Sequence, residues 1–139
     1  MKIKRILSII LSIACMATLY VPVCAVESRA SDQIAVYNML VDPVPGAMAV
    51  YFSVTGNGVV DKLGCESIYL YKMVDYDWVL EETKLEDDPG MSSTNDYDHT
   101  NSLRCYTERG EAYKIVVTIF SENSKGRDTR SKTFYEIGK

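Results

Sequence analysis

The sequence has few of the residues that most often carry catalysis or bind metals. Its 139 residues include one histidine, His99, and four cysteines, of which only Cys65 and Cys105 lie beyond the first 25 residues. Two cysteines forty residues apart and a single histidine do not make a zinc site. No Gly-x-Ser-x-Gly elbow is present, and His99 stands among aspartates in a polar stretch typical of a solvated loop. These absences predict a protein that is not an enzyme and holds no metal or cofactor.

Acidic residues are plentiful, but their spacing is not that of a known site. They cluster at Asp75/Asp77, Glu86/Asp87/Asp88 and Asp96/Asp98. Calcium takes six to eight oxygen ligands from a shaped loop, and no EF-hand spacing occurs here. A carboxylate pair can also hydrolyse glycosides, but a domain of roughly 110 residues leaves little room for a substrate cleft. We therefore expect these clusters to be solvated loops.

A long apolar run without charge lies near the start of the chain. Lys2, Lys4 and Arg5 form a basic start, and 6–23 follows as an uncharged apolar stretch that Pro22 would interrupt as a helix. This pattern is typical of a secretory signal peptide. Beyond residue 30 no long 3.6-residue periodicity, internal repeat or low-complexity tract appears, so helix is expected only in this leader.

Small residues at the end of the apolar run indicate where the leader is removed. We predict a signal peptide over 1–25 with cleavage after Ala25, and Ala30 as the second choice. A flexible stub over 26–32 would then precede a domain over 33–138. An uncleaved anchor is the alternative, because the apolar run is roughly long enough to span a bilayer. Cleavage predicts a secreted or cell-wall-associated protein that no longer contacts a membrane.

The charge of the remaining chain limits its partners. Removing the leader leaves 12 basic residues against 19 acidic residues, a net charge of −7. That sign disfavours binding to nucleic acid or to an anionic membrane surface through bulk charge.

Alternation of apolar and polar residues predicts extended structure over the rest of the chain. The clearest case is the set Tyr113, Ile115, Val117 and Ile119, which recurs every second residue. Turn residues such as Gly56-Asn57-Gly58 separate the runs. The predicted strands are 33–41, 47–55, 66–73, 78–83, 103–106, 112–120 and 129–137. Seven short strands predict an all-β fold, a single antiparallel β-sandwich after the signal peptide helix.

Cys65 and Cys105 are an even pair in a predicted exported domain, which favours a disulfide between them. The bridge would stabilise the fold by about 3–4 kcal/mol in the chain-entropy model. Two free thiols are the alternative.

The segment Gly110–Val117, followed by a Ser/Asn/Lys/Gly loop and a Ser/Thr-bearing strand, resembles the last hairpin of a fibronectin type III domain. The resemblance implies that Tyr113 is a tyrosine corner, with its ring in the core and its hydroxyl on the upstream backbone. It also implies that Cys65 and Cys105 lie at opposite ends of the sandwich, too far apart to bridge unless the strands are shifted. The wider layout of leader, Cys, Trp, Cys and Gly-x-x-Tyr resembles small exported proteins of Gram-positive bacteria.

The tyrosines indicate a binding surface. Tyr69 and Tyr71 are two residues apart on one predicted strand, and Val116 and Phe120 project from its neighbour. Tyr51 is also expected on an outer face. An aromatic outer face can bind an extracellular protein or a glycan, which predicts a non-catalytic binding module. Cross-strand packing that only stabilises the sheet is the alternative reading of these residues.

Two other functions stay open. A structural protein could associate with itself through an unpaired edge strand. A small hydrolase using His99 is the weaker alternative.

Overall fold

The computed structural model describes residues 33–139; the predicted signal helix, the cleavage after Ala25 and the stub lie outside this range. The described chain is all-β, as predicted, and contains no helix. Its six strands are β1 (Ile34–Val44), β2 (Ala47–Val74), β3 (Asp77–Leu85), β4 (Ser92–Tyr106), β5 (Ala112–Asn123) and β6 (Gly126–Ile137).

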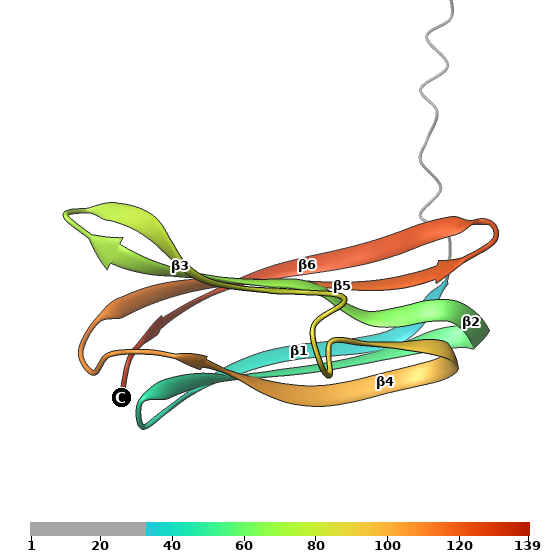
Figure 1. The fold of residues 1–139 in the computed structure, drawn as a ribbon, viewed down its shortest axis with the longest axis horizontal. Helices are drawn as coiled ribbons and strands as arrows, with labels where there is room; N and C mark the ends of the chain where they lie inside the picture. Colours follow the sequence, from blue (N-terminus) through green and yellow to red (C-terminus); the bar gives the residue numbers. More distant parts are fainter. Residues whose placement is uncertain (1–32) are drawn as a thin grey trace, which may run out of the picture.

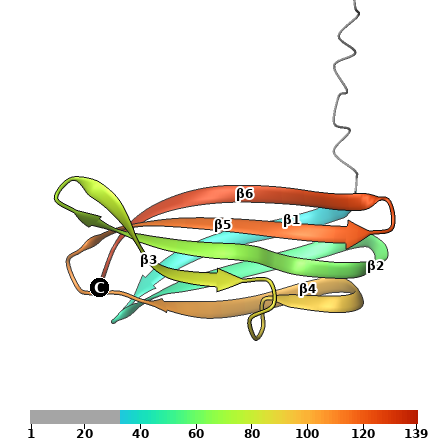
Figure 2. The same cartoon turned by 45° about the horizontal axis from the view of Figure 1, so that its top comes forward.

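Strand β2 organises the sheet, because it pairs with four other strands. Its first part lies between β1 and β4, and its second part lies between β3 and β5, with β6 beyond β5. Every pairing is antiparallel. The sheet curls so that a β1–β2–β4 half faces a β3–β2–β5–β6 half, as Figures 1 and 2 show.

The core fills the space between the two halves. The predicted inward set of β5, from Tyr113 to Ile119, is at most 1% exposed and packs in one core with alternate residues of β1 and of both parts of β2. These partners include Met39, Val41, Val50, Phe52, Val54, Ile68 and Leu70. The Tyr113 hydroxyl accepts the backbone N–H of Glu108 at 2.8 Å, so its single polar atom is satisfied.

Two predicted strand boundaries are wrong. The predicted strands 47–55 and 66–73 are one strand, because the chain does not turn back at Gly56-Asn57-Gly58 but bulges, shifting the register between Thr55 and Val60. The short strand predicted at 103–106 begins eleven residues earlier, at Ser92. Its polar sequence is typical of a loop, but pairing with β2 gives its backbone a ladder of partners.

Gly64 lies where β2 passes from one half of the sheet to the other. It pairs with Ser92 of β4 and with Phe120 of β5. Its φ is +147°, and a Cβ at this position would collide with the backbone oxygen of Met91. Only glycine therefore allows the three strands to approach here.

Both cysteines are free and buried, so the predicted disulfide is not formed. Cys65 lies opposite Ile119 of β5, whereas Cys105 lies opposite Met48, so they stand on opposite halves of the curled sheet. The Cys65 thiol donates to the carbonyl oxygen of Thr118 at 3.3 Å. Burial raises the pKa of each thiol to about 12.

Candidate functional site

Three of the four residues predicted to form a binding face share the outer surface of the β3–β2–β5–β6 half. Tyr69 and Val116 lie directly opposite each other on β2 and β5, and both are half-buried. Tyr71 lies opposite Lys114, whose ammonium is 4.3 Å from the centre of the tyrosine ring. The structure therefore brings Tyr69, Tyr71 and Val116 together.

Phe120, the fourth residue, is not part of an exposed face. Its side chain is fully buried, although it projects from the same side of β5 as Val116. The Arg127 guanidinium lies 3.8 Å from the centre of its ring, and the Lys62 ammonium lies 6.0 Å away. The expectation that Phe120 lies on an exposed outer face is wrong, because these two cationic side chains cover it.

The cations over Phe120 belong to an ion-pair cluster at one end of the sheet. Arg127 contacts Glu66 at 3.1 Å and Glu122 at 3.0 Å, and also contacts Glu86. Lys62 contacts Glu86 at 3.4 Å. The hydrogen bond from Arg127 lowers the pKa of Glu86 below its usual value. Lys62 also contacts Asp87 at 2.8 Å, so two cations meet four carboxylates and both cations are paired. We therefore interpret the cluster as a structural contact between strands.

Two aromatic residues that were not predicted on this face, Trp78 and Tyr135, extend it. Trp78 and Tyr135 have ring centres 5.8 Å apart, and the Lys114 ammonium lies 5.5 Å from the Trp78 ring. Tyr135 reaches this position because it lies opposite Lys114 across the β5–β6 pair. The alternation of residues in β6 could have indicated that Tyr135 points outward. The sequence does not give the register between β6 and β5, which places Tyr135 opposite Lys114. We call the set Tyr69, Tyr71, Trp78, Lys114, Val116 and Tyr135 the aromatic face.

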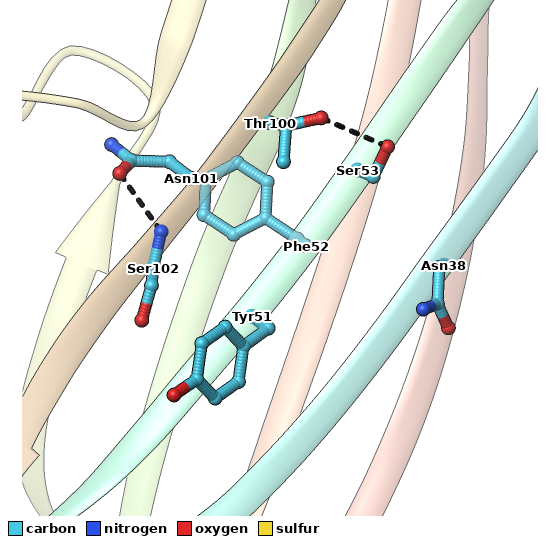
Figure 3. A pocket seen from close by; sticks show the side chains of 7 residues that line it. All are labelled: Asn38, Tyr51, Phe52, Ser53, Thr100, Asn101 and Ser102. Carbon is cyan, nitrogen blue, oxygen red and sulfur yellow. Dashed lines mark hydrogen bonds between the residues drawn. The ribbon is translucent and has the colours of Figure 1, made fainter.

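The other half of the sheet carries a pocket of about 310 Å³ on β1, β2 and β4. Tyr51 of β2 is one of its lining residues and is 42% exposed. Figure 3 shows the lining residues, which are Asn38, Tyr51, Phe52, Ser53, Thr100, Asn101 and Ser102. We call this the Tyr51 pocket. Its volume is at the lower end of the roughly 300–1,000 Å³ range of ligand sites.

Strand register explains why this pocket forms. Tyr51 lies opposite Ser102, and Ser53 lies between Asn38 and Thr100. Residues directly opposite on neighbouring strands share a face, so side chains far apart in the sequence converge. The sequence predicted that Tyr51 points outward, but the register that adds β4 to the site could not be predicted.

His99 does not form a catalytic constellation with its neighbours. Its Nε2 atom lies 2.9 Å from the Gly90 carbonyl oxygen, and its ring lies 5.7 Å from that of Phe52. Within residues 33–139, no hydroxyl, thiol or carboxylate is hydrogen-bonded to the His99 ring. No group of three or more His, Cys, Asp or Glu side chains in that range is placed to hold a metal ion.

Residues 33–139 contain no helix of the length and hydrophobicity that crossing a membrane requires. No family model, curated protein or solved structure matches this chain.

Proposed function

We propose that this protein is an exported, non-catalytic binding module, secreted or associated with the cell wall, that holds a protein partner on the aromatic face. The observation that carries the proposal is the grouping of Tyr71, Trp78 and Tyr135 around Lys114 on a continuous sheet. A glycan is the alternative occupant of this face. The basic and apolar leader supports export.

The fold supports a β-sandwich similar to a fibronectin type III domain. Two halves of an antiparallel sheet face each other across one core, which is the arrangement of a sandwich. The contact of the Tyr113 hydroxyl with the Glu108 backbone resembles the tyrosine corner of such domains.

The chemistry of the aromatic face favours a protein over a sugar. Aromatic residues are enriched in the energetic centres of protein interfaces. Apolar side chains border the face, with Leu80 49% and Ile137 56% exposed. Lys114 lies against two rings, where cation–π contacts hold the ammonium ready to meet a carboxylate of a partner.

Trp78 provides a direct test, because it is the single tryptophan of the chain. Cell-surface proteins that bind to the immobilised full chain are first collected. The full chain is then titrated with each of these proteins, and Trp78 emission is followed. We expect the emission to shift and the combined Tyr71→Ala and Tyr135→Ala variant to bind at least about tenfold more weakly. Tyr106→Ala is the matched control, since Tyr106 is 79% exposed outside this face. Equal affinity of wild type and double variant for every retained protein would refute the proposal.

Self-association is a second candidate, favoured by one observation. In the described chain β3 pairs only with β2, so its outer edge is open, and Val79 and Leu80 are about half exposed on it. Light scattering of the processed protein separates the two functions. A monomer at high concentration would argue against pairing of copies through β3.

A further inference from the structure

The Tyr51 pocket has a lining that differs in chemistry from the aromatic face on the opposite half of the sheet. Its side chains carry hydroxyls, amides and one exposed aromatic ring, that of Tyr51, because the Phe52 ring is buried in the core; none of them carries a charge. We propose that the Tyr51 pocket is a binding site for a neutral sugar residue. This inference does not depend on the aromatic face or on its partner.

The absence of charge in the lining selects the ligand class. A phosphate, carboxylate or nucleotide would require Lys, Arg or a cluster of backbone N–H groups, and the lining has no cationic side chain. A cationic ligand would require a carboxylate, and the lining has none. What the pocket offers is neutral donors and acceptors, which match the hydroxyls of an uncharged sugar.

The polar atoms of the pocket divide into those that hold its shape and those left for a ligand. The Asn101 amide already has protein partners, because its nitrogen donates to the Gly90 oxygen at 2.7 Å and its oxygen accepts the Ser102 N–H at 2.8 Å. Thr100 donates to the Ser53 hydroxyl at 3.0 Å, which leaves the Ser53 hydrogen free to donate outward. The Asn38 amide and the Tyr51 hydroxyl have no protein partner among the described residues.

The Tyr51 ring supplies the apolar surface that a sugar also needs. One side of a pyranose presents C–H groups, which pack against the face of an aromatic ring. Tyr51 is 42% exposed, and its direct neighbour across the strand, Leu40, is 53% exposed. A stacking surface beside a row of hydroxyl and amide groups can therefore contact both kinds of sugar surface at once.

The site is rigid before a ligand arrives. The middle strand, β2, is hydrogen-bonded on both sides here, to β1 and to β4. Between the outward residues, Val50, Phe52 and Val54 are buried in the core, so the backbone beneath the pocket is fixed. Weak ligands benefit most from such preorganisation, because little entropy is lost when they bind.

The test is calorimetric titration of the full chain with maltotetraose, cellotetraose, mannotetraose and chitotetraose. We expect at least one of them to bind and Tyr51→Ala to weaken that binding about tenfold. Tyr51→Phe keeps the ring and should stay within about threefold of wild type. Tyr106→Ala, an exposed tyrosine of the same half, should bind as wild type does. Circular dichroism shows whether each variant is folded. Ser53→Ala is a second test variant, since loss of the Ser53 hydroxyl should also weaken binding.

Trp78 emission locates the ligand, because Trp78 belongs to the aromatic face on the other half of the sheet. A sugar in the Tyr51 pocket should leave that emission unchanged. Three results would overturn the proposal: none of the four sugars binds, Tyr51→Ala binds as wild type does, or binding shifts Trp78 emission and is lost in Tyr71→Ala. The last result would place the sugar on the aromatic face and leave the protein partner of that face to be tested separately.

Discussion

At the scale of single residues, burial decides what the two cysteines of the domain can do. Cys65 and Cys105 are at most 1% exposed, and burial raises the pKa of each thiol to about 12. The thiolate is the reactive form of cysteine, so almost none of either residue is reactive near neutral pH. Both therefore act as small apolar side chains of the core.

This environment predicts protection from alkylation. Iodoacetamide at pH 8 should leave the peptides containing Cys65 and Cys105 unmodified in the folded protein and label both after unfolding in urea, as read by mass spectrometry. Rapid labelling of either peptide without denaturant would contradict the burial. A bridged peptide pair in protein isolated without reductant would show that the two halves of the sheet rearrange to form the disulfide.

At the scale of secondary-structure elements, one side chain joins four segments. Arg127 lies at the start of β6, Glu122 on β5, Glu66 on β2, and Glu86 directly after β3. The guanidinium also packs on Phe120, so its loss removes apolar cover as well as charge. The Arg127 cluster thus fixes the end of the sheet where these segments meet.

Replacing Arg127 with Gln should lower the free energy of unfolding by about 1–2 kcal/mol near neutral pH. Glu86 has a pKa below its unfolded value of 4.5, so its contribution is present above pH 4.5 and is lost as the pH falls through the folded pKa. Urea unfolding from pH 7 to pH 3 should therefore show wild type and variant converging in acid. Lys125→Gln, which changes a nearby exposed cation outside any ion pair of the described chain, should have no such effect.

At the scale of the whole molecule, the passage of β2 between the two halves depends on Gly64. Gly64→Ala should lower the free energy of unfolding by at least about 2 kcal/mol, because the new Cβ meets the backbone of Met91 and the φ of +147° is strained for alanine. Gly58→Ala separates the two causes. Gly58 also has a positive φ, +95°, but open space around it, so this change should cost only about 1 kcal/mol. Equal effects in chemical denaturation would show that space at Gly64 is not limiting.

Local alternation allowed most of the strands to be predicted from the sequence. The inward set of β5 and the outward direction of Tyr51, Tyr69 and Tyr71 follow from a period of two residues. Alternation could not reveal that β2 continues through Gly56-Asn57-Gly58, since the same residues also fit a turn. It could not reveal the start of β4, whose polar residues are extended because β2 provides their partners.

The candidate sites were harder to predict because they depend on register between distant strands. Tyr135 joins the aromatic face through its pairing position opposite Lys114, and Thr100 joins the Tyr51 pocket opposite Ser53. The prediction that Phe120 lies on the surface was wrong for a similar reason. The Phe120 ring is covered by the guanidinium of Arg127, which lies on another strand. Alternation predicts toward which side of the sheet a side chain points, but not which other side chains lie on that side.

The 28-residue length of β2 has a consequence for how the molecule unfolds. Each half of the sheet takes its hydrogen-bonded middle from this one strand, so neither half can detach and remain intact alone. Loss of structure is thereby made cooperative, a single all-or-none event. The connectivity therefore disfavours a long-lived, half-open species with an exposed apolar layer, the kind of species that leads to aggregation.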